Sequence, residues 1–386
     1  MKRVILIRSN PVRPDPPVEK AALALLKAGY QVTIIGWDRD GEYVQKKAEM
    51  QISGHKAEVI RFGIPATFSG GMKKNLKAMV IFQNRLRNWL IRNRADYDII
   101  HAFDFDTGLI ASRYAKKFRK KFVYHILDYY VASHGLRGTR LEKPILYLEN
   151  SIINFADATL ICTEKRREQI AGTNPKRLAV IHNTPSASQF RPCDPITKQT
   201  GRVKVAYVGI LEPSRMLKQI AEAVSEDPGL ELHVGGFGTM EAFFTEMSAR
   251  CDNIIYYGRL PYDQTLSLEK ECDIMTAIYD PKIDNHRYAA PNKFYESLML
   301  GKPLIMVRGT GMSEVVEENG IGALIDYSRE GFIDGMTRLV AAKDQWPAME
   351  KRMKELYQNQ FCWDEMERRL MRIYTELENE KNSDRQ

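Results

Sequence analysis

Three loops in the second half of the sequence carry residues with the chemistry to bind phosphate and hydroxyl groups. In the first loop, Gly209 ends a β-branched run and Arg215 follows close to the start of a predicted helix. The free N–H groups of a helix N-terminus attract phosphate, and a guanidinium adds parallel hydrogen bonds. The second loop ends another strand at Gly236 and Gly238, where the missing side chains let the backbone approach a ligand closely.

The third loop reads Pro291-Asn292-Lys293 and places Glu296 one helical turn further on. Lys293 and Glu296 are three positions apart, so a helix presents them on one face. An ammonium suits a phosphate, and a carboxylate suits ribose hydroxyls. Each loop alone also fits a plain structural feature, namely a helix cap, a surface ion pair or a tight turn. The prediction of a binding site rests on all three loops following strands of one sheet.

Several other kinds of site are excluded or disfavoured. No G-x-G-x-x-G follows the first strand, where Arg8-Ser9-Asn10-Pro11 stands, and Gly301-Lys302-Pro303 lacks the spacing of a P-loop. These absences argue against dinucleotide and P-loop nucleotide sites. The five cysteines are scattered and form no C-x-x-C pair, so we expect neither a zinc site nor a disulfide framework. No nucleic-acid recognition motif is present, and we expect no nucleic-acid partner.

Short β-branched runs alternate with amphipathic helical stretches along both halves of the 386 residues. This alternation predicts two α/β domains of doubly wound, Rossmann-like type, with parallel sheets facing a cleft. The expected helices include 216–225 and 292–300. The expected strands are 4–7, 32–35, 98–101, 122–124, 158–162 and 178–181 in the first half, and 203–208, 230–234, 254–257, 274–277, 304–307 and 323–325 in the second.

The segment from Pro291 to Pro303 resembles a motif of the family-4 glycosyltransferases of the GT-B fold, in the branch written P-N-K-x-x-E-x-x-x-x-G-K-P. The resemblance implies a GT-B architecture with a C-terminal crossover helix. We expect an acceptor-binding domain at 1–184, a linker at 185–200 and a nucleotide-sugar-binding domain at 201–357. Residues 358–386 then form a helix that returns to the first domain.

The resemblance also implies roles for individual residues. Arg215 and Lys293 would face the donor diphosphate as catalytic groups, and Glu296 would hold the donor ribose. Tyr288 stands eight positions before Glu296, where the family motif has its first glutamate. The remaining residues expected to contact the donor are Gly209, Gly236, Gly238, Asn292 and Tyr288.

Two residues of the first half are candidates for the acceptor side. His101 ends the predicted strand 98–101, and Asp128 follows the strand 122–124 in a loop similar to the acceptor loop of the family. Both are candidates for catalytic roles at a sheet edge. Both residue types also serve as loop-packing or capping groups, so this alternative stays open.

The net charge of +8 is distributed unevenly. Residues 1–195 hold 33 lysines and arginines against 18 acidic residues, and the remainder holds 24 against 31. The segment 69–94 has seven basic residues, no acidic one and several large apolar residues. It predicts either a helix packed on its own domain or a basic amphipathic surface that meets an anionic membrane. With no signal sequence or membrane span, we expect a cytoplasmic protein, peripheral on the inner face of the cell membrane.

The leading interpretation is a retaining, metal-independent glycosyltransferase without a cofactor. It would move a sugar from a nucleotide-diphosphate sugar to a glycan or lipid-linked acceptor, as in polysaccharide or glycolipid biosynthesis. Two alternatives remain at this point. One is a nucleotide-sugar 2-epimerase, which shares the fold, and the other is a non-catalytic nucleotide-sugar-binding subunit, which Tyr288 would favour.

Overall fold

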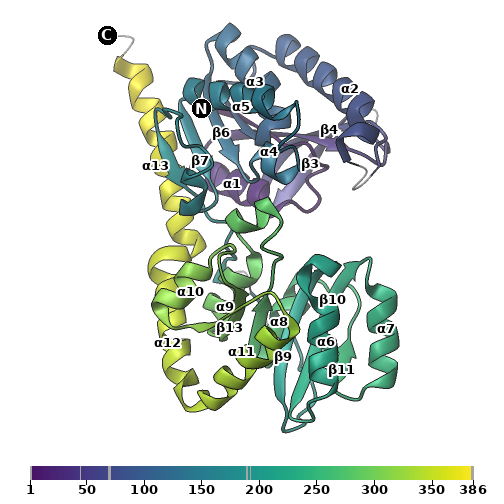
Figure 1. Cartoon of the computed structure of the whole chain (residues 1–386). Coiled ribbons are helices and arrows are strands. Elements are labelled where there is room, and N and C mark those ends of the chain that lie inside the picture. The colour runs from purple at the N-terminus through teal and green to yellow at the C-terminus, as the bar shows by residue number, and fades with distance from the viewer. Residues whose placement is uncertain (1, 44, 68–70, 188–189, 192, 384–386) are drawn as a thin grey trace. The chain divides into compact units, whose positions relative to one another are not determined.

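The chain folds into two compact units. The computed structural model describes residues 2–43, 45–67, 71–187, 190–191 and 193–383. Unit 1 contains the residues up to Asn183 and those from Met366 onward, and unit 2 contains Thr184–Glu365. Each unit is a Rossmann-like α/β domain built around one sheet, and a long helix ends the chain (Figure 1). This is the fold class predicted from the sequence.

The sheet of unit 1 has eight strands in the order β3-β4-β2-β1-β5-β6-β7-β8. Its central strands are β-branched runs with almost every side chain buried, as parallel strands covered on both faces require. The bounds are β1 Arg3–Ile7, β2 Gln31–Asp38, β3 Lys46–Ile52, β4 His55–Gly63, β5 Ile99–Phe103, β6 Lys121–Ile126, β7 Ala158–Ile161 and β8 Leu178–Val180.

The expectation of an all-parallel first sheet is wrong at one edge. β3 pairs antiparallel with β4, and the two strands form a hairpin that the strand prediction had missed. Ser53 and Gly54 both have positive φ at its turn (+47° and +82°), the combination that matches the twist of a two-residue hairpin. β4 itself pairs parallel with β2 and continues the sheet.

The helices of unit 1 pack on this sheet. α3 contacts β5 and β6, and it lies between α2 and α5, so these three helices form one layer (Figure 1). α1 begins at an N-cap in which the Asp15 carboxylate accepts the N–H of Val18. The bounds are α1 Pro16–Lys27, α2 Gly71–Arg92, α3 Asp104–Phe118, α4 Tyr130–Ser133 and α5 Glu142–Phe155.

Helix α2 has a buried face and an exposed apolar stripe. Phe82 is fully buried and stacks on Trp37 at 5.1 Å between ring centroids, and Trp89 is also buried. The expectation that one side of this helix packs on its own domain is therefore met. Leu76, Val80 and Ile81 remain exposed by 58%, 48% and 37%. No helix in the described part of the chain is long and apolar enough to cross a membrane.

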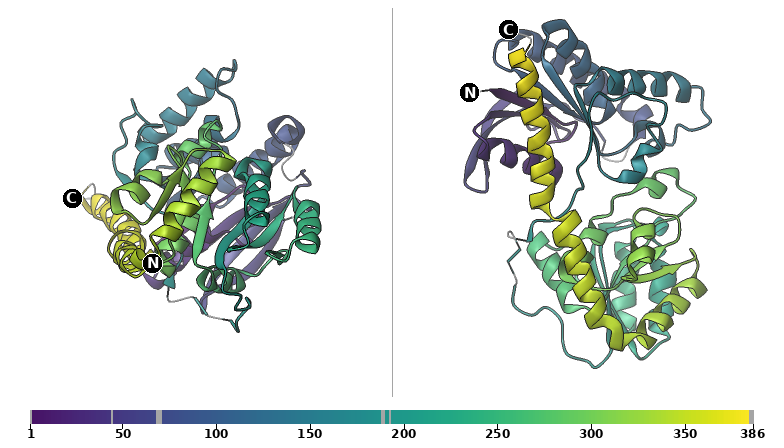
Figure 2. Two further views of the ribbon diagram at one scale, coloured as in Figure 1. Left: turned by 60° about the horizontal axis from the view of Figure 1, so that its bottom comes forward. Right: turned by 90° about the vertical axis from the view of Figure 1, so that its left-hand side faces the viewer.

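The C-terminal helix α13 (Trp363–Ser383) lies along unit 1 from Met366 onward (Figures 1 and 2). The Tyr374 hydroxyl lies 2.9 Å from Nδ1 of His101, and the Tyr30 hydroxyl donates to the Glu378 carboxylate at 2.7 Å. These contacts join the end of the chain to the first sheet.

The sheet of unit 2 has six parallel strands in the order β11-β10-β9-β12-β13-β14. The sequence predicted all six strands. The strand bounds are β9 Val203–Leu211, β10 Leu230–Gly238, β11 Ile254–Tyr256, β12 Ile274–Ala277, β13 Leu304–Val307 and β14 Gly322–Ile325. The helix bounds are α6 Leu217–Ser225, α7 Glu241–Arg250, α8 Tyr262–Glu271, α9 Asn292–Leu300, α10 Ser313–Asn319, α11 Arg329–Ala341 and α12 Trp346–Leu356.

The described part of the expected linker 185–200 packs on unit 2. The Tyr357 hydroxyl donates to the carbonyl of Pro185 at 2.8 Å. The N–H groups of Ile196 and Thr197 donate to the Glu271 carboxylate of α8. The segment is therefore anchored to the second domain along much of its length.

Candidate active site

The residues predicted to bind phosphate and ribose lie near the carboxyl ends of β9 and β10 in unit 2. β9 and β10 pair in parallel over nine residues, and the register places Gly236 beside Gly209. A Cβ atom on Gly236 would lie only 1.8 Å from the carbonyl oxygen of Gly209, and one on Gly238 would lie 2.5 Å from that of Leu211. Gly236 and Gly238 have φ of +134° and +148°. Glycine is therefore required at both positions because a side chain would collide with the backbone of β9.

Gly209 instead makes room for a side chain. A Cβ atom at this position would lie 2.6 Å from Nζ of Lys293, and the residue has a φ of +151°. The ammonium also lies 4.7 Å from the ring centroid of Tyr207, a cation–π distance. Burial lowers the pKa of Lys293, while Glu296 and Glu269 oppose that shift. Lys293, in the first turn of α9, therefore places its ammonium against the backbone of Gly209 at the end of β9.

Arg215 brings a second positive charge to the same place. It ends the short helix η3 (Pro213–Arg215) that follows β9. Its guanidinium carbon lies 3.8 Å from the ring centroid of Tyr279, and its Nη1 lies 3.4 Å from Nε2 of His286. The charge of Arg215 also lowers the pKa of Lys293. An arginine after β9 and a lysine in the first turn of α9 are cations of the kind that suit a diphosphate.

Glu296 lies one turn after Lys293 and is 4% exposed. Its Oε1 accepts a hydrogen bond from the Tyr262 hydroxyl at 3.0 Å. α9 begins after Pro291 and ends at Gly301 with φ +71°, so the sequence positions both side chains on a short, well-defined helix. Lys293 and Glu296 therefore share α9, and the Lys293 ammonium reaches Gly209. Their roles toward a donor stay predictions.

Asn292 and Tyr288 lie at the margin of this cluster. Asn292 is the first residue of α9 and is exposed. Tyr288 ends the short helix η4 (Asp284–Tyr288), is 6% exposed and lies 5.6 Å from the guanidinium of Arg287. The roles of both residues toward a donor stay predictions.

A second carboxylate, which the sequence prediction missed, lies beside this cluster. Glu269 of α8 is 1% exposed, and its Oε2 has no hydrogen-bond partner among the described residues. Burial raises its pKa well above the usual value, Glu296 raises it further and Lys293 opposes the shift. Burial and the neighbouring Glu296 therefore favour the protonated form of Glu269.

Unit 1 has a polar cavity of about 440 Å³ at the corresponding end of its own sheet. Asp104, with φ +60°, follows β5 and accepts the N–H groups of Leu127 and Asp128 at 2.8 and 3.1 Å. Arg8 is held between Asp15 and Asp104. Asp128 lines the cavity with a half-exposed side chain, paired with Arg166 at 3.1 Å.

The expected position of His101 at an accessible sheet edge is wrong. The ring is fully buried, with Nδ1 against the Tyr374 hydroxyl and Nε2 3.3 Å from Nδ1 of His125. Burial lowers the pKa of His101 to about 3, so the ring is neutral. His101 packs the sheet of unit 1 against α13 and does not reach a ligand.

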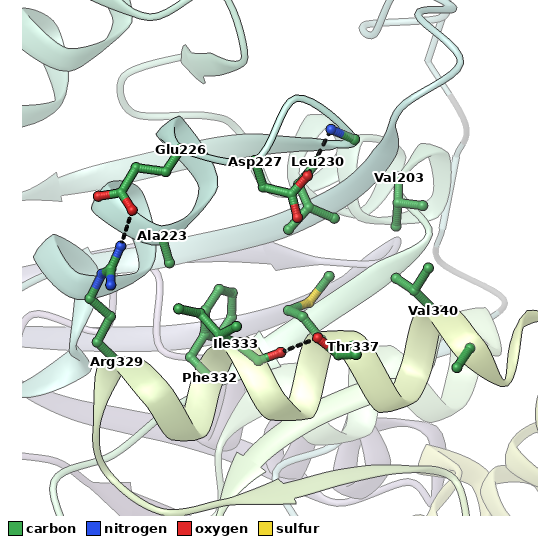
Figure 3. Close-up of a pocket in the computed structure, with 13 residues that line it drawn as sticks. Val203, Ala223, Glu226, Asp227, Leu230, Arg329, Phe332, Ile333, Thr337 and Val340 are labelled. Carbon is green, nitrogen blue, oxygen red and sulfur yellow. Dashed lines mark hydrogen bonds and ion pairs between the residues drawn. The ribbon is translucent and has the colours of Figure 1, made fainter.

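Unit 2 also has a larger hollow of about 540 Å³ at the other end of its sheet (Figure 3). Phe332 and Ile333 of α11 face Val203 and Leu230, which begin β9 and β10. Arg329 at its rim is paired with Glu226. The hollow is apolar and lies at the amino ends of the strands, whereas ligands of such sheets bind at the carboxyl ends.

Two family models match the chain. Residues 18–184 match Glycosyltransferase Family 4, and residues 194–359 match Glycosyl transferases group 1. The chain is a family-4-like glycosyltransferase of the GT-B fold. It therefore transfers a glycosyl group from a nucleotide sugar, the coarse function predicted from the sequence.

Solved structures share the fold of this glycosyltransferase over nearly its full length. Sucrose-phosphate synthase from Thermosynechococcus elongatus has a TM-score of 0.75 at 15% identity, covering 98% of this chain and 99% of the other. Anabaena HepE in complex with UDP has a TM-score of 0.68 at 14% identity, covering 97% and 100%. The catalytic domain of starch synthase IV from Arabidopsis thaliana, bound to ADP and acarbose, has a TM-score of 0.66 at 13% identity, covering 97% and 99%. No curated protein sequence matches the chain.

Sequence reasoning missed four residues that shape the donor cluster of the glycosyltransferase. They are Tyr262 and Glu269 of α8, Tyr279 shortly after β12, and His286 of η4. The four share no spacing or motif. Only Tyr279 and His286 gave a signal in the sequence, because they lie close to Pro291.

The raised pKa of the buried Glu269 can be tested by measuring the free energy of unfolding as a function of pH. The unfolded chain ionises this residue above its ordinary pKa of about 4.5, whereas the raised pKa keeps the proton on the folded chain to higher pH, so the free energy of unfolding falls as pH rises between the two pKa values. Glu269→Gln cannot ionise and should gain stability over the wild type as pH rises from 5 to 8. We expect a gain of about 1.4 kcal/mol for each pH unit by which the pKa is raised within this range. Denaturant unfolding at both pH values measures it.

Glu271→Gln on the same helix is the matched control. Burial would raise the pKa of Glu271, but the N–H donors of Ile196 and Thr197 outweigh it and lower the pKa. This variant should therefore lose stability at neutral pH and approach the wild type only as pH falls below about 4.5 and through the lowered pKa of Glu271. A Glu269→Gln variant that is destabilised equally at every pH would contradict the neutral buried carboxyl.

Proposed function

We propose that the enzyme is a retaining glycosyltransferase that uses a nucleotide-diphosphate sugar, needs no metal or cofactor, and acts on a glycan or lipid-linked acceptor. The observation that carries the proposal is the approach of the Lys293 ammonium to Gly209 at the end of β9, with Glu296 one turn further along α9 and Arg215 at the end of the short helix that follows β9. It is further supported by the nucleotide diphosphates in related folds, since HepE was solved with UDP and starch synthase IV with ADP.

In this proposal Arg215 and Lys293 bind the diphosphate, and Glu296 accepts hydrogen bonds from the ribose hydroxyls. The bond between the anomeric carbon and the phosphate oxygen breaks, and a bond from that carbon to an acceptor oxygen forms on the same face of the sugar. The acceptor hydroxyl gives its proton to the departing phosphate. Negative charge on that phosphate grows during the step, and two fixed cations stabilise it in the role that a metal has elsewhere.

The acceptor side of the proposal rests on the cavity of unit 1. Asp128 is half-exposed there, and Arg166 keeps its carboxylate in place. A carboxylate at this position can accept hydrogen bonds from sugar hydroxyls. We therefore assign Asp128 to acceptor binding and assign no catalytic role to His101.

The first test of the proposal is Glu296→Ala. Loss of one or two ribose hydrogen bonds to the carboxylate should weaken nucleotide binding by about 1.5–3 kcal/mol while the protein stays folded. Titration calorimetry with UDP and ADP measures it, and the exposed Glu318→Ala serves as the matched control. Glycosyl transfer from a nucleotide-sugar panel should persist in excess chelator. The proposal fails if Glu296→Ala binds as the wild type does, or if chelator abolishes transfer and magnesium restores it.

We also propose that α2 attaches the enzyme peripherally to an anionic membrane surface, which places it in the cytoplasm at the inner face of the cell membrane. Lys74 and Lys77 are exposed on the same helix as the apolar Leu76, Val80 and Ile81. α2 has no acidic residue. Exposed apolar side chains flanked by lysines are the pattern of an interfacial helix.

Vesicle flotation tests this membrane contact. The wild type should float with vesicles that contain anionic lipid and be released as salt rises, because each nearby lysine contributes about 1 kcal/mol. Lys74→Gln with Lys77→Gln should reduce flotation, and so should Val80→Ser with Ile81→Ser. Lys218→Gln with Lys351→Gln, two exposed lysines of unit 2, should leave it unchanged. Equal flotation with anionic and neutral vesicles would refute the attachment.

A further inference from the structure

The Arg215 guanidinium is held by two side chains that no sequence motif predicted. The Tyr279 ring covers one of its faces at 3.8 Å, and Nε2 of His286 lies 3.4 Å from its Nη1. The Tyr279 and His286 rings are nearly perpendicular, with centroids 5.0 Å apart. Stacking alone leaves a guanidinium free to rotate over the ring, so the histidine contact fixes its direction.

The partners of His286 determine which nitrogen carries the proton. Nδ1 lies 3.0 Å from the backbone carbonyl oxygen of Asp280, which can only accept. Nδ1 must therefore carry the hydrogen, and Nε2 is left with a lone pair. Because a guanidinium can only donate, that lone pair is what Arg215 requires. The neutral ring with its proton on Nδ1 satisfies both neighbours at once.

The surroundings of His286 favour this neutral form. The residue is 9% exposed. Burial lowers the pKa of His286 and the positive charge of Arg215 lowers it further, against opposing effects of Asp280 and Glu212. A second proton would turn Nε2 into a donor and place two cations against each other.

We propose that His286 is a positioning residue that holds Arg215 in place for the donor diphosphate, and that only its neutral form can do so. The proposal rests on the proposed function, which assigns Arg215 to the diphosphate. Protonation of His286 releases Arg215 from its fixed direction without unfolding the unit. Turnover then falls on the acid side of the pH profile, below the ordinary histidine range.

Two substitutions separate the two contacts of the ring. In His286→Gln the carboxamide oxygen reaches the place of Nε2, accepts from Arg215 and does not titrate. In His286→Asn the amide nitrogen reaches the place of Nδ1 and donates to Asp280, but nothing accepts from Arg215. We expect His286→Gln to keep most of kcat at pH 7.5 and to lose the acid limb of the profile. We expect His286→Asn to lower kcat by about 10- to 100-fold with little change in KM, as for a misplaced catalytic group.

A merely structural role predicts a different result. Both variants would then lose stability and activity alike, and the acid limb would persist in His286→Gln. Either outcome overturns the proposal.

A second measurement needs no turnover. An NMR titration of His286 in the wild type and in Arg215→Ala should show a higher pKa in the variant, because a nearby positive charge has been removed. Identical titration curves would show that the two side chains do not interact, and would overturn the proposal even in an active enzyme. If the wild type transfers no sugar, the proposed function fails, and the titration still decides whether His286 holds Arg215.

Discussion

The Lys293 ammonium lies against Gly209, 2.6 Å from the point where any other residue would place its Cβ atom. This contact links the end of β9 to the first turn of α9, and most of the donor cluster depends on it. Glu296 follows one turn later on the same helix, and Arg215 enters from the short helix after β9. The glycines of β10 serve the same arrangement indirectly, because Gly236 lets its strand lie against the backbone of Gly209. A binding surface of bare backbone and two cations results.

Concentrating positive charge in this way requires control of the neighbouring groups. Glu269 is buried without a hydrogen-bond partner for its Oε2 among the described residues, and its raised pKa favours the uncharged carboxyl over a second negative charge beside Glu296. For His286 the shift has the opposite direction. Burial and the charge of Arg215 both lower its pKa, which favours the neutral ring. The raised pKa of Glu269 and the lowered pKa of His286 thus both favour the uncharged form, as is common where environment shifts the pKa of groups at a binding site.

The sequence predicted those parts of the molecule that depend on local patterns. Helix α9 runs from Asn292 to Leu300 as expected, because Pro291 and Gly301 delimit it. The strands of unit 2 were recognisable as buried β-branched runs. The burial of His101 could not be recognised from the sequence. Whether the end of a strand is exposed or buried depends on what covers it, and His101 is covered by Tyr374 of a helix far along the chain. The contact of His286 with Arg215 likewise joins residues 71 positions apart. A contact between residues so far apart leaves no periodic pattern in the sequence.

The most direct test of this account is Gly209→Ala, because the added methyl group would displace the Lys293 ammonium. Calorimetric titration should compare UDP or ADP, whichever binds the wild type more tightly, with its monophosphate. The account predicts that the folded variant loses at least about tenfold of the preference for the diphosphate, as expected when a charge-assisted contact is lost. A variant that unfolds at the wild-type temperature and keeps the full preference for the diphosphate would contradict it.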